Sequence, residues 1–499
     1  NTTTTPTTAN SLTSDGTGTA SFTSALSSMS AQTLYYVRAY ATNNVGTAYG
    51  NELTFRTLSN PATAQASSLS ATATASGQLT ISWTGATFPS SGATQGGYAL
   101  IYSAGTPTLS SANGAAPAAG VGTLVTITPT TLPTAPATSY VLNGLTGGIT
   151  YNFLLVPFTW DGTNAVTYNY LTASAPTGSG TAVTTASVTT TAVSSIAATS
   201  ASSGGTSINS GGGTVSAKGV VWNTSTAPTT SNSLTSDGTG TADFSSSLTS
   251  LSPQTLYYYR AYVTNNIGTV YGSESSFYTL SSEPTAAATS FTATANGSAQ
   301  IDLAWTAATY PGSGATNSGY IILRRVDSTN PTTSGVADGV APASLSLPSG
   351  TTLVTTITSG GTASFSHTGL LASTQYNYII IPFTWDGTNA ATYNYYLTSA
   401  PNANATTAAG LPSVATTTAA TSITNNSASS GGSTLVAGGS AITAKGVAYN
   451  TTGTPTTADN TTSDGSGTAD FSSSLTGLSG QTVYYVRAYR SEEHTSELQ

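Results

Sequence analysis

Two sequence patterns alternate along this chain. The first is a tyrosine-rich heptapeptide at residues 34–40 (LYYVRAY), 256–262 (LYYYRAY) and 483–489 (VYYVRAY). The second, PFTWDGTNA, occurs without change at residues 157–165 and 382–390. Both recur roughly every 225 residues, and self-similarity at a fixed period indicates a repeat architecture. The chain is therefore predicted to be an alternating A-B-A-B-A array and not one large globule.

The repeat sets the predicted boundaries, with segments close to the usual domain size of roughly 100 residues. We expect a partial A segment that lacks its first strands, then B, A and B segments, then an A segment without its last strand, at residues 1–59, 60–187, 188–281, 282–410 and 411–489. Residues 490–499 (RSEEHTSELQ) break the pattern directly after RAY and resemble the translation of a common sequencing adapter. We therefore expect them not to belong to the natural repeat.

Composition excludes several classes of function. Charged residues make up 5% of the chain, against about 25% in ordinary globular proteins, but 27 Tyr and 5 Trp lie largely at repeating positions and indicate folded segments. A net charge of −8 with 9 Lys and Arg leaves no basic surface for nucleic acid. No apolar run is long enough to span a membrane, and the lack of cysteine excludes disulfides and thiolate metal sites.

The pattern of short β-prone runs predicts sandwiches. In the second A segment, strands are expected at 188–193, 214–223, 242–248, 255–264 and 269–279, separated by Gly- and Ser-rich turns, with essentially no helix. In the B segments, residues 103–137 and 327–361 are expected to form loops or an irregular extra hairpin. Runs 153–156 and 378–381 are apolar on both faces, so the long loop or a neighbouring A segment is expected to cover the second face.

One local spacing is more specific. Leu251, Thr255 and Tyr257 lead into a strand with the spacing of the tyrosine corner, in which a Tyr hydroxyl bonds to the connecting backbone. The second B segment has the same spacing at Leu370, Thr374 and Tyr376, whereas the first B segment keeps Leu145 but has Ile149 in place of the Thr. The tyrosines that occupy this position in the five segments are Tyr35, Tyr151, Tyr257, Tyr376 and Tyr484.

These features resemble immunoglobulin-like and fibronectin type III β-sandwiches. In this resemblance, Trp83 and Trp305 take the place of the core Trp of fibronectin type III domains. The A pattern, with its Lys-Gly-Val strand and LspqTlYYvRAYatNniGtaYG, and the B pattern, with its Tyr-Asn-Tyr segment before Ser-Ala-Pro, are similar to repeats of secreted and surface proteins of Bacteroidetes bacteria. The resemblance implies an all-β tandem array, an extracellular or cell-surface location, and partners such as surface glycans or proteins.

Strand alternation suggests one candidate binding surface. If Tyr257 points into the core, Tyr258, Arg260 and Tyr262 face the other side, and an Arg between two Tyr makes a cation–π stack plausible. The functional reading is an aromatic platform for sugar rings or a protein partner. The structural reading is a ladder that stiffens the sheet.

The repeated nonapeptide suggests a second candidate. An exposed Trp beside Asp and Asn at a loop tip could stack on a sugar and bond its hydroxyls; these residues are Trp160, Asp161 and Asn164, and Trp385, Asp386 and Asn389. Alternatively, the Trp packs over the end of the sandwich and Asp-Gly makes the turn.

The chain has few residues that could serve in catalysis or metal binding. Asp237 and Asp243 hint at calcium, but calcium takes six to eight oxygens, and a tight turn is favoured. His367 aligns with Leu142 of the other B copy, so no His recurs as a base, and no cofactor is expected. The sequence predicts a non-catalytic structural or adhesion array. The alternative is a carbohydrate-binding region attached to a polysaccharide-degrading enzyme.

Overall fold

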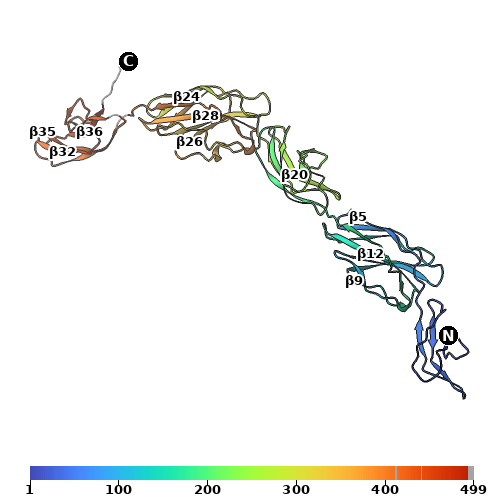
Figure 1. The fold of residues 1–499 in the computed structure, drawn as a ribbon. Helices are drawn as coiled ribbons and strands as arrows, with labels where there is room; N and C mark the ends of the chain where they lie inside the picture. The colour runs from blue at the N-terminus through green and yellow to red at the C-terminus, as the bar shows by residue number, and fades with distance from the viewer. Residues whose placement is uncertain (411–412, 440, 493–499) are drawn as a thin grey trace. The chain divides into compact units, whose positions relative to one another are not determined.

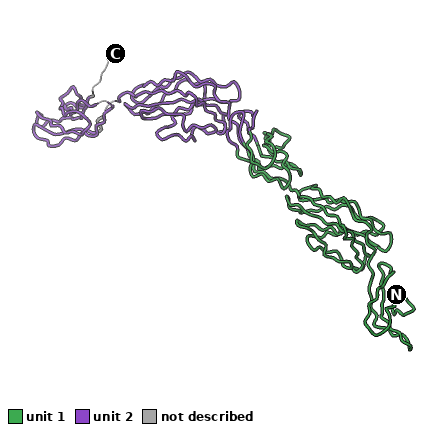
Figure 2. Tube along the Cα trace, viewed as in Figure 1, with its two compact units in different colours: residues 1–192, 203–246, 258–275 green, residues 193–202, 247–257, 276–499 purple. Residues whose placement is uncertain are grey.

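The structure is a computed structural model that describes residues 1–410, 413–439 and 441–492 (Figure 1). These residues form β-strands and three single-turn 3₁₀ helices, with no α-helix among them. The predicted all-β class of tandem sandwiches is confirmed. Two compact units are distinguished, residues 1–192, 203–246 and 258–275, and residues 193–202, 247–257 and 276–499 (Figure 2). The five finer segment boundaries stay a prediction.

Both B segments contain two antiparallel sheets with the same strand order. In the first, β5 (Ser67–Ala75), β6 (Gln78–Thr84) and β11 (Ser139–Leu142) form one sheet. The other sheet has the order β10 (Thr123–Thr131), β7 (Gln95–Ser103), β12 (Thr150–Trp160) and β13 (Asn169–Tyr170), and β14 (Thr177–Thr181) also pairs with β12. The expected extra hairpin is β8 (Thr108–Leu109) with β9 (Ala119–Val121). The 3₁₀ helix η1 (Ala165–Thr167) precedes β13.

The second B segment repeats this plan. Its three-stranded sheet is β23 (Thr289–Ala295), β24 (Gln300–Thr306) and β27 (Ser364–Thr368). Its larger sheet is β26 (Thr352–Ile357), β25 (Asn317–Arg325), β28 (Gln375–Trp385) and β29 (Asn394–Tyr395), with β30 (Asn402–Thr406) on β28. The 3₁₀ helices are η2 (Pro342–Ser344) in the long loop and η3 (Ala390–Thr392) before β29.

The A segments also consist of paired sheets. The second has β15 (Ser187–Ser194), β16 (Ala201–Asn209) and β19 (Phe244–Leu248) in one sheet. Its other sheet is β18 (Ser233–Leu234), β17 (Ala217–Asn223), β20 (Leu256–Asn265) and β21 (Gly268–Tyr271), with β22 (Ser275–Tyr278) on β20. The first A segment has the pairs β1 (Leu34–Val37) with β4 (Leu53–Arg56) and β2 (Tyr40–Thr42) with β3 (Thr47–Tyr49).

The third A segment pairs β31 (Ser413–Thr421), β32 (Ser427–Val436) and β35 (Phe471–Thr476), and separately β34 (Asn460–Thr461), β33 (Ile442–Asn450) and β36 (Tyr485–Glu492). Strand β36 runs past Tyr489 into the adapter-like sequence, where Arg490 lies opposite Lys445. The rest of that sequence, residues 493–499, lies outside the described residues.

Strand β16 is missing from the sequence prediction, which treated its Ser- and Gly-rich run as a turn. It is the central strand of its sheet. A Cβ added at Gly204 would approach the backbone oxygen of Phe244 to 2.1 Å, and one at Gly205 would approach its ring to 2.5 Å. Glycine is therefore required at these two positions because Phe244 packs closely onto the strand, and not because the chain turns there.

Each B segment buries both faces of its central strands. Between the sheets, Trp305 meets Tyr320 edge-on at a centroid distance of 5.4 Å, as Trp83 meets Tyr98 in the first copy. On the outer face, Ile321, Ile379 and Ile381 pack with Val336, Leu345 and Leu347 of the long loop. Of the two covers that the sequence left open, the long loop is the one found in the second B segment.

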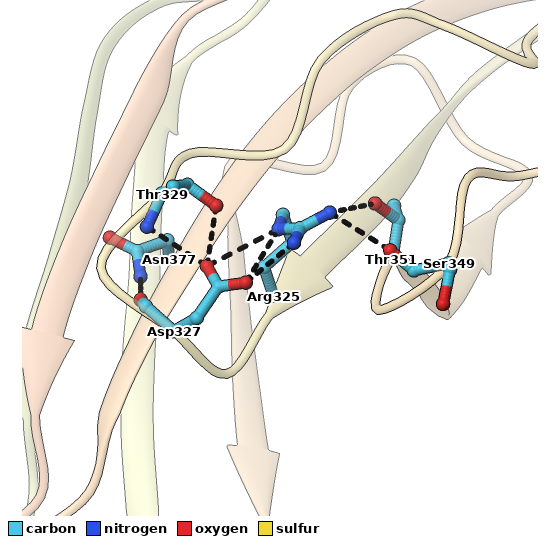
Figure 3. A network of polar contacts seen from close by, with 6 residues as sticks. All are labelled: Arg325, Asp327, Thr329, Ser349, Thr351 and Asn377. Atoms are coloured by element: carbon cyan, nitrogen blue, oxygen red, sulfur yellow. Dashed lines mark hydrogen bonds and ion pairs between the residues drawn. The ribbon is translucent and has the colours of Figure 1, made fainter.

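Polar contacts hold this loop of the second B segment to its sheet (Figure 3). Arg325 at the end of β25 forms an ion pair with Asp327, and its Nη1 also donates to the backbone oxygen of Ser349, at 3.0 Å. Asn377 on β28 donates to the backbone oxygen of Asp327. In the first copy, Asn152 donates in the same way to Gly105. Because that contact is present in both copies, the ion pair is an addition peculiar to the second.

The two B cores differ at one polar pair. In the second, His367 Nδ1 lies 2.9 Å from the hydroxyl of Tyr378, and burial, with a smaller contribution from the charge of Arg324, lowers the pKa of His367 to about 4. In the first, the matching positions hold Leu142 and Phe153, which are both buried. The first copy thus shows that the site also accepts an apolar pair.

We predict that this difference makes the second B segment acid-sensitive. Because the pKa of His367 is depressed in the folded state, its contribution to stability is complete above pH 6.5 and is lost as the pH falls toward 4, by about 2 kcal/mol after allowance for partial burial. The double variant His367→Leu, Tyr378→Phe should abolish this loss.

The measurement is hydrogen exchange of β28 between pH 4 and 7, corrected for the intrinsic exchange rates, with β12 of the first B segment as internal control. An unchanged pH dependence in the double variant would contradict the assignment.

Candidate functional site

A tyrosine hydroxyl bonds to the preceding loop in all five segments. In each case it accepts a hydrogen bond from the backbone N–H five residues earlier: Ser30 to Tyr35 at 2.8 Å, Thr146 to Tyr151 at 3.2 Å, Ser252 to Tyr257 at 3.0 Å, Leu371 to Tyr376 at 2.9 Å and Ser479 to Tyr484 at 3.0 Å. The longest of these distances belongs to the copy with Ile149 in place of Thr. The bond satisfies a loop N–H and holds the loop against the strand.

The Trp of each repeated nonapeptide stacks on a nearby tyrosine. Trp160 lies 4.7 Å from Tyr168, with 15° between the ring planes, and Trp385 lies 4.8 Å from Tyr393, at 21°. Both Trp side chains are half-buried. Trp160 Nε1 donates to Gln95 Oε1 at 3.1 Å, whereas Trp385 Nε1 is buried without a partner. One face of each indole is therefore already covered from within the same segment.

The Asp of the nonapeptide organises its turn. Asp161 Oδ1 accepts from the backbone N–H groups of Thr163, at 2.8 Å, and Asn164, at 2.6 Å, and Asp386 makes the same two bonds. Partial burial opposes ionisation of Asp161, but the hydrogen bonds from Asn164 and Thr163 outweigh it and lower its pKa to about 2. The carboxylate is thus a constant acceptor for the loop backbone at neutral pH.

The two copies differ in their asparagine. Asn164 Nδ2 donates to Asp161 Oδ2 at 2.7 Å, whereas Asn389 Oδ1 accepts from the backbone N–H of Ala391 at 3.0 Å. In both arrangements the asparagine side chain bonds within its own loop. The three predicted residues of each loop are therefore close together, and the tyrosine under the indole was absent from the predicted set, although the repeated Tyr-Asn-Tyr segment marked its position.

The predicted aromatic platform of the second A segment is not an open surface. Tyr262 is only 4% exposed, and its hydroxyl donates to the backbone oxygen of Thr235 at 2.9 Å. The expectation that this residue contributes to an exposed platform is wrong, because the loop before β19 covers it. Tyr258 and Arg260 are half-buried.

Arg260 does make a cation–π contact, but with a different tyrosine. Its guanidinium lies 4.0 Å from the ring centre of Tyr271 on the neighbouring strand β21, and its Nε donates to the backbone oxygen of Pro228 at 2.7 Å. Arg38 stacks on Tyr49 in the same way, at 4.8 Å. Arg260 therefore connects β20 to the loop that contains Pro228 and to the edge strand β21.

The remaining acidic candidates also have internal partners. Asp237 Oδ2 accepts from Thr235 and Ser246, both at 2.6 Å, and Asp243 Oδ1 accepts from the backbone of Ser207 at 3.1 Å. Within the described residues, no cluster of three or more His, Cys, Asp or Glu could hold a metal ion. In the same part of the chain, no helix has the length and apolarity needed to cross a membrane.

Comparisons with known proteins give little further information. No family model matches the chain, and no curated protein matches it. Among solved structures, it is similar to the crystal structure of chicken CNTN1 FN1-FN3 domains, at 13% identity over 61% of this chain and 92% of that chain, with a TM-score of 0.18.

We predict that the tyrosine hydroxyl contributes measurably to stability. Tyr376 is 2% exposed, so Tyr376→Phe should leave the N–H of Leu371 without its partner and destabilise the second B segment by about 1–2 kcal/mol. Hydrogen exchange of β28 measures the loss. Tyr140→Phe in β11 of the first B segment, at a tyrosine that is 37% exposed, is the control, and it should have almost no effect on hydrogen exchange of β12 in that segment. Equal effects of the two changes would contradict the assigned role.

Proposed function

We propose that this chain is a non-catalytic structural array of a secreted or cell-surface bacterial protein, which spaces or displays a functional domain. One observation carries the proposal: the candidate binding residues make their side-chain contacts within their own segments, and the turn-forming Asp and the strand Arg do so alike in successive copies. Asp161 and Asp386 cap equivalent turns in the two B segments, and Arg38 and Arg260 stack on tyrosines of equivalent strands in the first two A segments. Repetition of structural contacts suits a spacer.

The surface and extracellular location belongs to the proposal as well. It is supported by the sequence resemblance to repeats of secreted and surface proteins. Glycans or proteins of the cell surface are the proposed partners of the chain. Carbohydrate binding by the array itself is a second candidate, and the half-buried indoles of Trp160 and Trp385 are the groups that would serve it.

A spacer predicts that reach depends on the number of repeats. Chains attached to a surface through a C-terminal tag should form a thinner layer when residues 188–410, one A–B period, are deleted, because one spacing unit is lost. Optical interferometry measures the layer, and an N-terminal epitope reports access by a bulky antibody. An unchanged thickness and an unchanged access would contradict the spacer function.

A glycan array separates the two candidates. The spacer hypothesis expects no glycan to be retained by the full chain. Saturable binding that is lost in the Trp160→Phe, Trp385→Phe variant would instead establish the carbohydrate-binding function. Phenylalanine keeps an aromatic ring over Tyr168 and Tyr393, so the loops are expected to stay folded.

A further inference from the structure

The loop that precedes the corner tyrosine in the first two A segments contains a glutamine with a left-handed backbone conformation. Gln32 and Gln254 both have φ of 55°, in the left-handed region that non-glycine residues rarely adopt. Each backbone N–H donates to the carbonyl of a closing leucine, Leu58 or Leu280, at 3.1 Å. The conformation belongs to the tyrosine corner itself, since Ser373 of the second B segment adopts it at the matching position with φ of 49°, and in the A segments it is a glutamine that the corner holds there.

The glutamine amide bridges an A segment and the B segment that follows. Gln254 Nε2 donates to Ser281 Oγ at 2.7 Å, and Gln254 Oε1 accepts from Thr316 Oγ1 at 2.8 Å. In the first copy, Gln32 donates to Ser59 at 2.8 Å and accepts from Thr94 at 2.9 Å. Both ends of the amide are therefore used, identically in the two junctions.

At the boundary between the second A and second B segments, Ser281 and Ser282 have every backbone N–H and C=O group in a hydrogen bond. Ser281 N donates to the carbonyl of Thr392 at 2.9 Å, and Asn394 Nδ2 donates to the carbonyl of Ser281 at 2.7 Å. Ser282 N donates to the carbonyl of Gly314 at 2.7 Å, and Thr384 Oγ1 donates to the carbonyl of Ser282 at 2.7 Å.

The first junction repeats all four bonds. Ser59 N donates to Thr167, Asn169 donates to Ser59, Asn60 N donates to Gly92 and Thr159 donates to Asn60, at 2.9, 2.7, 2.7 and 2.7 Å. A linker bonded at every N–H and C=O cannot rotate without breaking those bonds.

The receiving groups belong to the repeated nonapeptide and the turn that follows it. Thr384 is its third residue and is fully buried, and the carbonyl of Thr392 is placed by the Asp386 turn, because Thr392 Oγ1 donates to Asn389 O at 2.8 Å and accepts from Asp386 N at 3.1 Å. Gly314 completes the seat, since a Cβ there would approach Ser282 Oγ to 2.1 Å. These contacts with the preceding A segment give a physical reason for the identical sequences of residues 157–165 and 382–390.

We propose that PFTWDGTNA with its following turn is the docking surface for the closing edge of the preceding A segment, and that the bridging glutamine locks the two into a fixed joint. The partner of each nonapeptide is thus the Leu-Ser end of an A segment of this chain. The joint goes beyond the proposed function, since it would hold the two segments in one relative orientation whether the array spaces a domain or binds a glycan.

Spin-label distance measurements on the full chain test the joint, and the absence of cysteine allows labels to be placed freely. One label pair, at Ser247 and Ser364, spans the junction, and a second pair, at Ser344 and Ser364, lies within the second B segment; all three residues are exposed. The unmodified junction should give a narrow distance distribution. Gln254→Ala and Thr384→Val should each at least double the width for the spanning pair and leave the internal pair unchanged.

Gln375→Ala is the matched control, because Gln375 is exposed and its amide bonds only to Asn377 of the same segment. A spanning distribution that is broad in the unmodified chain, or equally narrow in Gln254→Ala and Thr384→Val, would overturn the proposal. Should Gln254→Ala also broaden the internal pair, Thr384→Val decides, because valine preserves the volume of the buried threonine. These distances do not depend on display or glycan binding, so the joint and the proposed function can fail separately.

Discussion

The hydrogen bond from a loop N–H to the hydroxyl of the following tyrosine holds the end of every segment in place. In the second A segment, the hydroxyl of Tyr257 holds Ser252, and Thr279 then bonds to both sides of the same loop. The loop is thereby fixed with Gln254 in its left-handed conformation. A core contact within one segment thus determines what the segment presents at its end.

The B segments add a second constraint, which is the burial of both faces of their central strands. One face packs against the opposite sheet and the other lies under the long loop, so the loop is part of the core. Tyr395 shows the connection, since its N–H donates to Asp338 and its hydroxyl donates to Val340 of that loop, as Tyr170 bonds Asn113 and Ala115. Strand, loop and receiving turn are therefore one packed layer.

Predictions from sequence succeeded where the relevant contact is short-range or periodic. The run 378–381 is apolar at every position, and it is covered on both sides as such runs usually are. The predictions from sequence failed where one residue type can serve two structural roles. Gly204 and Gly205 look like turn residues, yet they lie in a central strand beneath Phe244. Tyr262 alternates away from the core, yet a loop buries it. Neither neighbour is visible along the strand itself.

The all-β class, the alternating repeat and the tyrosine-corner spacing could be predicted from the amino-acid sequence, because they follow from residue periodicity and from contacts a few positions apart. The contacts of the repeated loops, by contrast, became apparent in the folded arrangement of the sheets. Gln254 bonds to residues 27 and 62 positions away, and Thr384 bonds to one 102 positions away. Hydrogen bonds act over about 3 Å in space, irrespective of distance along the chain, so such partners emerge only when the sheets bring them together.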